Sequence, residues 1–253
     1  MGKPTVGIFG LTGCAGDQIV ILDCEDQLLD IVALVDIKDF LTASSENQTD
    51  CPLDVALVEG AALTQRDNEM LWAIRARSKT LVALGTCAVW GGVAAMDQGA
   101  DRARLMEEVY GEAGRGYDSH AAQALHEIVK VDLKITGCPI EKEHFVAAMA
   151  ALLNGDVPLY PEYPVCTECR MRENNCLLIE RGEICCGPLT AAGCNARCPE
   201  LRVPCVGCRG PAEDTNAASL LALFEEKGFD RQRIAARLRT FAPAGVVQGG
   251  LAQ

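Results

Sequence analysis

Nine of the fourteen cysteines lie between positions 166 and 208. Pro, Gly and Cys dominate this segment and its helix or strand periodicity is weak, so it cannot bury much apolar surface. Packing thiols explain scattered cysteines but not a cluster. Disulfide frameworks are typical of short secreted chains, and we expect no secretory signal in the N-terminus of this 253-residue chain. The segment therefore favours a metal site whose ligands contribute to folding.

Upstream of this segment, short apolar runs alternate with amphipathic stretches. The runs are rich in Val, Ile and Leu and apolar on both faces, as in buried parallel strands; they cover 5–10, 30–36, 53–60, 80–85 and 131–137. Helices are predicted between them, over 17–29, 66–77, 101–113, 119–130 and 140–152. This alternation predicts an α/β fold with a doubly wound, mostly parallel sheet.

The end of the chain predicts a helical tail. Residues 215–241 fit two helices, the first ended by Gly228 and the second capped by Asp230.

Three cysteines follow predicted strands directly: Cys14, Cys87 and Cys138. The carboxyl edge of an open α/β sheet forms its ligand crevice, so these thiols can converge there. Glycines around them permit close approach of the backbone to a bulky ligand. Asp17 shares the loop of Cys14 and is either a fourth ligand or an acid favoured by the start of a helix.

The downstream spacing suits iron–sulfur clusters better than zinc. Cys166-x-x-Cys169 and Cys205-x-x-Cys208 are separated by five further cysteines, more than a zinc site with two such pairs needs. Two clusters with four thiolates each would use eight of the nine cysteines.

Seven motifs in a fixed order resemble one family. They are GLTGCAGD, LVEGA, GTCAVWGGV, TGCPI, VCTEC, CCGPLTAAGC and CVGC. Together they resemble the small, iron–sulfur subunit of cytoplasmic nickel–iron hydrogenases, of the methyl-viologen-reducing and sulfhydrogenase delta type. The N-terminal half also resembles the cluster-bearing subunit of respiratory complex I, but that relative lacks the downstream cysteines.

The resemblance implies three parts and three iron–sulfur clusters, all of the 4Fe-4S type. A flavodoxin-like domain, 1–155, carries the proximal cluster; an irregular cysteine-rich domain, 156–212, carries the medial and distal clusters; a helical tail, 213–253, follows. The proximal ligands would be Cys14, Asp17, Cys87 and Cys138. The distal ligands would be Cys166, Cys169, Cys176 and Cys185, and the medial ligands Cys194, Cys198, Cys205 and Cys208.

The assignment of ligands to the three clusters depends on a few particular positions. Cys185 is preferred to Cys186 because it has the family's C-x-G-P spacing, and the cysteine at 198 favours four irons in the medial cluster. The family has a cysteine where this chain has Asp17. Cys24, Cys51 and Cys186 are left over, of which Cys24 and Cys51 are expected to be packing thiols, and none of the three histidines falls in a cluster motif. Glu59 and Trp90 are expected near the site or its interface.

The implied function is electron transfer. The chain would carry electrons from H2 oxidation at a partner large subunit, which holds the nickel–iron centre, to a further electron-accepting subunit. That subunit could be a flavoprotein, a deazaflavin-reducing subunit or a heterodisulfide-reductase linker. A net charge of −12 argues against nucleic acid, no apolar run suggests membrane insertion, and the expected location is cytoplasmic. A hydrogen sensor, a non-hydrogenase relative and a zinc-stapled interaction module remain as alternatives.

Overall fold

The computed structural model describes residues 2–96, 100–213 and 215–241, apart from the side chain of Asp26. The chain forms two compact units, Met1–Ile135 and Thr136–Gln253. The division of the chain into three parts at 155 and 212 stays a prediction.

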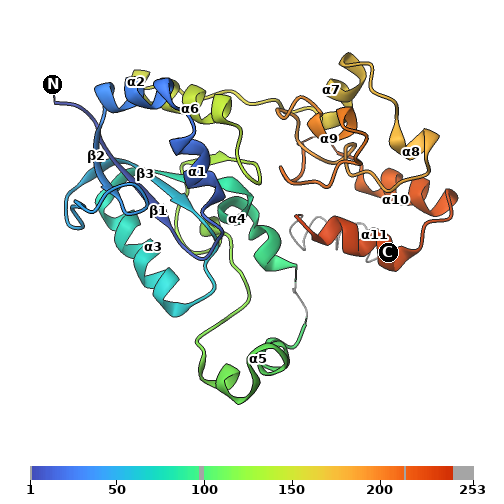
Figure 1. The fold of residues 1–253 in the computed structure, drawn as a ribbon, viewed down its shortest axis with the longest axis horizontal. Coiled ribbons are helices and arrows are strands. Elements are labelled where there is room, and N and C mark those ends of the chain that lie inside the picture. Colours follow the sequence, from blue (N-terminus) through green and yellow to red (C-terminus); the bar gives the residue numbers. More distant parts are fainter. Residues whose placement is uncertain (1, 97–99, 214, 242–253) are drawn as a thin grey trace. The chain divides into compact units, whose positions relative to one another are not determined.

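The first unit is built on a five-stranded parallel sheet (Figure 1). Its strands are β1 (Thr5–Gly10), β2 (Asp36–Phe40), β3 (Leu53–Glu59), β4 (Ser78–Leu84) and β5 (Leu133–Ile135), in the order β2-β1-β3-β4-β5. The chain moves from β1 outward to β2, and then across β1 to β3, β4 and β5. Because parallel crossovers are right-handed, the two directions put helices on opposite faces. The predicted doubly wound α/β fold is confirmed.

The helices of this unit cover both faces of the sheet. α1 (Gly16–Leu22) and α2 (Asp26–Leu34) lie on one side and α3 (Gln65–Arg77) on the other (Figure 1). Ala56 and Val58 of β3 pack in one core cluster with Leu71 and Ile74 of α3. The short helix α4 (Gly85–Trp90) follows β4 and contributes to the same core.

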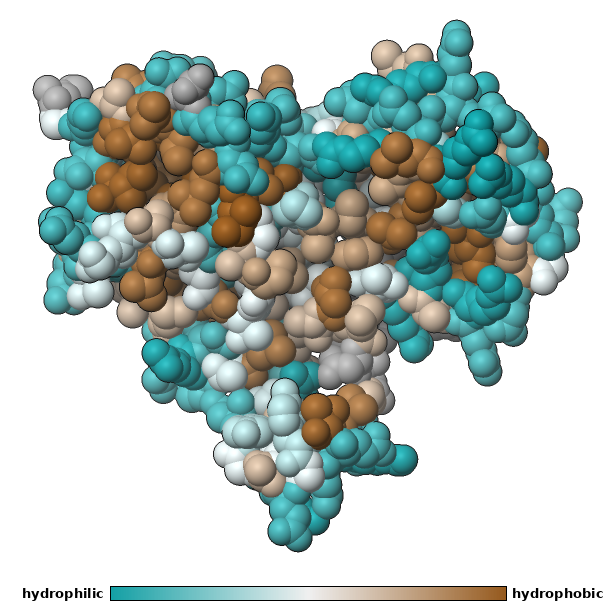
Figure 2. Space-filling model, viewed as in Figure 1, coloured by the Kyte–Doolittle hydropathy of each residue, from teal (hydrophilic) through white to brown (hydrophobic). Residues whose placement is uncertain are grey.

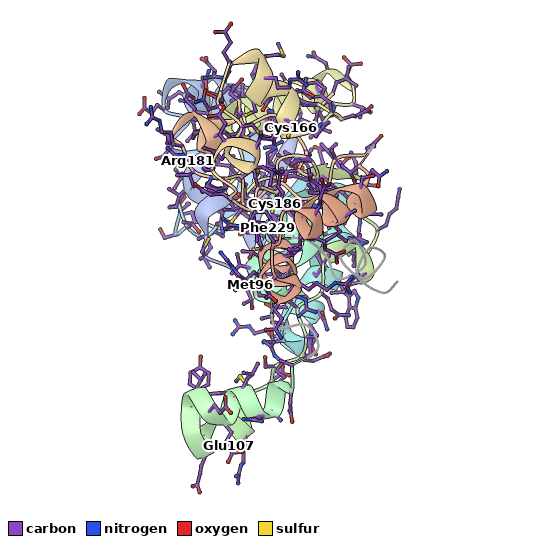
Figure 3. All side chains as sticks on the ribbon, turned by 90° about the vertical axis from the view of Figure 1, so that its right-hand side faces the viewer. Met96, Glu107, Cys166, Arg181, Cys186 and Phe229 are labelled. Carbon is purple, nitrogen blue, oxygen red and sulfur yellow. The ribbon has the colours of Figure 1, made fainter. Side chains whose placement is uncertain are left out.

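One part of this unit stands away from the sheet. α5 (Arg102–Tyr110) and the 3-10 turn at Gly111–Gly116 project from the body, as the position of Glu107 shows in Figure 3. No residue of α5 is buried.

Two predicted elements are wrong, and each has a physical reason. The apolar run at 30–36 forms the end of α2 instead, and the strand follows at Asp36–Phe40. β2 lies at the edge of the sheet, where a strand with polar residues is tolerated, so its pattern is weak. The helix predicted over 119–130 contains only the 3-10 turn at Leu125–Glu127, because residues 120 and 123 donate their N–H groups to residues 63 and 62.

The remaining boundaries shift by a few residues. The helix predicted over 17–29 is split in two, with Glu25 at a positive φ of 49° between the parts. Strand β1 and helix α3 agree closely with prediction, and a capping box of Thr64 and Asp67 begins α3.

The second unit has short helices joined by irregular loops. They are α6 (Lys142–Asn154), α7 (Val165–Met171), α8 (Leu177–Glu180), α9 (Arg197–Glu200), α10 (Ala217–Glu226) and α11 (Arg231–Arg239). The two predicted tail helices are α10 and α11. Gly228 follows α10 with a φ of +77°, and the side chain of Asp230 accepts from the N–H of Arg233 at 3.1 Å.

The tail helices complete a core for the cysteine-rich segment. Leu220 and Phe224 of α10 and Ile234 of α11 lie in one buried cluster with Val165 and Leu178. The segment is therefore held partly by apolar packing against α10 and α11.

No helix in the described ranges is long and apolar enough to cross a membrane.

Asp132 anchors the short strand β5, and its replacement tests that role. It accepts from the N–H of Leu81 at 2.9 Å and pairs with Arg75 and Lys130. Burial alone would raise the pKa of Asp132, but these donors and charges outweigh it and lower the pKa to about 2. We expect Asp132→Asn to lower the free energy of unfolding by about 1 kcal/mol at neutral pH.

The pH dependence of that difference follows from the lowered pKa. The carboxylate stabilises the fold above its unfolded pKa, and this contribution is lost as the pH falls through the folded value. Urea unfolding of both proteins should therefore converge between about pH 4 and pH 2. Asp50→Asn, at an exposed position, is the control. A difference that is unchanged in acid would contradict the assignment.

Candidate functional site

The first unit gathers charged and thiol groups at the carboxyl ends of β1, β3 and β4. Cys14 lies in the loop after β1, Glu59 is the last residue of β3, and Cys87 lies in α4 just after β4. Cys14 is exposed and Cys87 is half-buried. The predicted position of these thiols at one sheet edge follows from the parallel strands.

Glu59 holds the start of α1. It is 3% exposed, and its two carboxylate oxygens accept from the N–H groups of Asp17 (3.3 Å) and Gln18 (3.0 Å). The first N–H groups of a helix have no partner within the helix, and here the N-cap residue Ala15 supplies no side-chain bond. A carboxylate from the neighbouring strand takes that place, and it also complements the helix dipole.

The carboxylate of Asp17 lies over the start of α4. Asp17 is 6% exposed, and a Cβ on Gly85 would overlap its carboxylate. Gly85 also has a φ of +81°, so only glycine suits this position.

Cys87 faces the other groups of this edge. Burial raises the pKa of the Cys87 thiol, the N–H of Val93 opposes the rise, and the negative charges of Asp17, Cys14 and Glu59 add to it. The first unit thus brings Cys14, Asp17 and Cys87 together. Whether Asp17 is a ligand stays a prediction.

Cys138 belongs to the second unit, three positions after β5. Its backbone N–H is hydrogen-bonded to the thiol of Cys208. The peptide bond from Cys138 to Pro139 is cis.

The second unit contains one set of four thiols near α7 and α8. Burial, together with the charges of Cys185, Cys169 and Cys176, raises the pKa of Cys166 to about 12. Gly187 leaves room beside them, since a Cβ there would lie 3.3 Å from Cys166 Sγ and 3.6 Å from Cys185 Sγ. These four residues are the predicted distal ligands.

A second set of thiols lies around α9. Burial, together with the charges of Cys194 and Cys198, raises the pKa of Cys208 to about 11. Cys194, Cys198 and Cys208, three of the four predicted medial ligands, therefore lie near one another.

Cys205 differs from the rest of its predicted set. Its thiol lies 3.6 Å from the hydroxyl of Thr190, and the thiols that act on its pKa are those of Cys185 and Cys186. Its backbone N–H donates to Cys185 Sγ at 3.3 Å. Cys205 thus lies beside Cys185 of the other set, and its assignment to the medial set stays a prediction.

The three cysteines left over from the predicted ligand sets differ in exposure. Cys24 and Cys186 are buried and Cys51 is half-buried, and none of the three forms a disulfide. Cys186 is packed in the apolar core of the second unit and is labelled in Figure 3 beside Phe229.

The thiol environment fits an iron–sulfur cluster chemically. None of the fourteen cysteines, all of which the structure describes, forms a disulfide. Backbone N–H groups point at several sulfurs: that of Cys205 at Cys185, those of Ala196 and Arg197 at Cys194, and that of Cys138 at Cys208. Such N–H···S contacts tune cluster potentials. In the described part of the chain, no three His, Cys, Asp or Glu side chains are close enough to hold a single metal ion.

Sequence reasoning missed two contacts in the second unit. Arg209, directly after Cys208, is buried and contacts His144, and Glu168 accepts from the N–H groups of Gly193 and Ala196. Arg209 follows a Cys-x-x-Cys pair, which marks it as a neighbour of a ligand, but no local pattern indicates its partner in α6.

Comparisons with known proteins agree with this fold and thiol content. Residues 14–152, more than half of the chain, match the family described as NADH ubiquinone oxidoreductase, 20 Kd subunit. The chain is 38% identical to sulfhydrogenase 2 subunit delta of Pyrococcus furiosus, over 94% of this chain and 98% of the relative. It is 33% identical to a subunit of the F420-non-reducing hydrogenase vhu of Methanocaldococcus jannaschii, over 86% and 87%.

The fold is also similar to chains of solved hydrogenase structures. A chain of an NAD+-reducing [NiFe]-hydrogenase in the H2-reduced state is 29% identical, with a TM-score of 0.57, over 63% of this chain and 96% of that one. A chain of an actinobacterial-type NiFe-hydrogenase from Ralstonia eutropha shares the fold, with a TM-score of 0.61 at 18% identity, over 98% and 85%.

The chain therefore belongs to the family of the NADH ubiquinone oxidoreductase 20 kDa subunit and, within it, to the hydrogenase small-subunit type. Its relatives are subunits of hydrogenases, which are oxidoreductases. The many cysteines are consistent with iron–sulfur binding.

Glu59→Gln tests the role of Glu59 at the start of α1. The amide keeps one acceptor oxygen but turns an NH2 group toward the second backbone N–H. We expect a loss of about 1–3 kcal/mol in the free energy of unfolding, because a buried donor is left without a partner. Hydrogen exchange should become faster at the amides of Asp17 and Gln18. Glu112→Gln, at an exposed position, is the control, and unchanged exchange at both amides would refute the role.

Proposed function

We propose that this chain is the electron-transfer subunit of a nickel–iron hydrogenase. It relays electrons from H2, oxidised at a partner large subunit, through three iron–sulfur clusters of the 4Fe-4S type to a redox partner. The clusters, when bound, supply one-electron carriers, and the protein sets their potentials through ligands, hydrogen bonds and charge.

One observation supports the proposal most directly: the thiols fall into separate sets. Cys14 and Cys87 face each other with Asp17 in the first unit, whereas the second unit has one set led by Cys166 and another led by Cys208. Separate sets of thiols suit separate clusters better than one site. Apart from Cys138 and Cys205, the members of each set are those that the motifs imply for the proximal, distal and medial clusters.

The order of the sets also supports a relay. The N–H of Cys138, a proposed proximal ligand, is bonded to the thiol of Cys208, a proposed medial ligand. The N–H of Cys205, a proposed medial ligand, is bonded to the thiol of Cys185, a proposed distal ligand. Each contact joins backbone of one proposed site to sulfur of the next.

Exposed apolar side chains are evidence for an interface with a large protein partner. Figure 2 shows apolar residues gathered on the face that carries α1 and α2, where Ile19, Leu29 and Leu34 are exposed. Val109 and Tyr110 of α5 are exposed as well. Contiguous apolar surface of this kind marks interaction sites. A large subunit that carries nickel fits such a surface, with the GLTGCAGD and GTCAVWGGV loops at the contact.

The electron acceptor belongs to one of three classes: a flavoprotein, a deazaflavin-reducing subunit or a heterodisulfide-reductase linker. The acidic chain does not suit nucleic acid, and the expected site of action is the cytoplasm.

Metal analysis of the anaerobically purified complex tests the proposed function. We expect about twelve irons from this chain, four for each of three clusters, in addition to the iron that the partner subunits hold, and no zinc. Hydrogen-dependent dye reduction should accompany them, and the partner should carry four nickel-binding cysteines. One or two zinc ions without iron would refute the proposal, and a partner without those cysteines would favour a different reaction.

Asp17→Cys and Asp17→Ala test the proposed fourth proximal ligand. A carboxylate oxygen is a harder ligand than thiolate, so exchange for sulfur should change the electron paramagnetic resonance signal of the proximal cluster. Asp17→Ala should lower the iron content from about twelve toward about eleven per chain, since one iron loses its ligand. Asp23→Ala, at the other end of α1, is the matched control. If neither change at position 17 alters the signal, Asp17 only favours the helix start.

A further inference from the structure

Arg209 is a buried cation without a carboxylate partner. It directly follows Cys208 and is 3% exposed. Across the described ranges 2–96, 100–213 and 215–241, no ion pair joins it to Asp or Glu. A buried charge without a countercharge is costly. We therefore expect a negatively charged group near the guanidinium of Arg209.

Two contacts hold the guanidinium in place. Its Nε donates to the carbonyl oxygen of Ala192 at 2.9 Å, and its Nη2 lies 3.1 Å from Nδ1 of His144. Because arginine only donates, Nδ1 of His144 accepts, and the neutral ring carries its proton on Nε2. Burial and the charge of Arg209 lower the pKa of His144, which favours the same neutral form.

Gly193 makes this arrangement possible. A Cβ at this position would overlap Cε1 of His144 and lie 2.9 Å from Nη2 of Arg209, and Gly193 has a φ of +113°. The N–H of Gly193 is bonded at 2.7 Å to Glu168, whose other oxygen accepts from the N–H of Ala196 at 3.2 Å. The carboxylate of Glu168 thus stabilises the loop around Cys194.

The guanidinium acts on the thiols of one set. The charge of Arg209 lowers the pKa of both Cys194 and Cys208, against the burial that raises them. Its Nη1 is buried and has no hydrogen-bond partner in the described part of the chain. Arg209 therefore offers a positive charge near Cys194 and Cys208 and a buried N–H group that still lacks an acceptor in the described part of the chain.

We propose that Arg209 is the countercharge of the medial cluster and raises its reduction potential, with His144 as the residue that positions it. The inference rests on the proposed function. When one electron enters that cluster and no bond is made or broken, a fixed positive charge beside it stabilises the added negative charge. Arginine suits this role because it stays charged when buried.

Redox titration of the medial cluster, followed by electron paramagnetic resonance in the intact complex, tests the role of Arg209. At the midpoint of the wild-type cluster, Arg209→Met should lower the ratio of reduced to oxidised cluster about tenfold, or about 59 mV for one electron. Arg209→Lys keeps the charge and should restore most of the ratio. His144→Phe removes the acceptor for Nη2 and should give a smaller fall.

The matched control is Arg231→Gln. Arg231 lies in the same unit, is exposed and pairs with Glu225, so removal of its charge is screened by solvent. The midpoint potential of the medial cluster should be the same in Arg231→Gln as in the wild type.

The outcomes separate this inference from the proposed function. A wild-type chain without iron would refute the proposed function and this role together. Normal clusters in every variant, with the midpoint of Arg209→Met unchanged, would refute only the role of Arg209. If Arg209→Met loses its medial cluster, the other two variants test the role instead. The role is contradicted if His144→Phe keeps the wild-type midpoint potential and Arg209→Lys fails to restore the cluster.

Discussion

The register of three parallel strands sets the geometry of the first unit. Gly10 of β1 pairs with Glu59 of β3, and Glu59 pairs with Leu84 of β4. The three strands therefore end at one level, and the loops that carry Cys14 and Cys87 leave the sheet side by side. Glu59 uses this position to bond α1, so the same residue that ends a strand fixes the helix after Cys14.

In the second unit, irregular loops with strained backbone conformations must be held in place. Among the residues that the structure describes, six non-glycine residues have a positive φ, and four of them lie in these cysteine-rich loops: Glu173, Asn195, Ala196 and Arg202. Such conformations persist only when the surroundings determine them. Two sources of order meet here: the apolar core completed by α10 and α11, and the thiols together with the N–H groups aimed at them. The tail helices are therefore part of the structure that surrounds the thiols.

Much of the fold and of the candidate site could be predicted because the signals are local. Buried parallel strands such as β1 and β3 are apolar on both faces, and cysteines directly after strands or in pairs stand out in the sequence. The edge strand β2 could not be predicted this way, because only part of it is buried and its residues are mixed. The segment around residue 123 looked helical by pattern, but its backbone bonds to residues 62 and 63, which no local pattern indicates.

By itself, the sequence determined the class of fold, the family and which residue types supply the chemistry, since strand periodicity and cysteine spacing are properties of neighbouring residues. Only the tertiary structure decided which groups face one another. It bonded Glu59 to the start of α1, placed Cys205 beside Cys185 and joined Arg209 to His144, which is 65 residues away along the chain. The physical reason is that burial, countercharge and hydrogen bonding depend on distance in space.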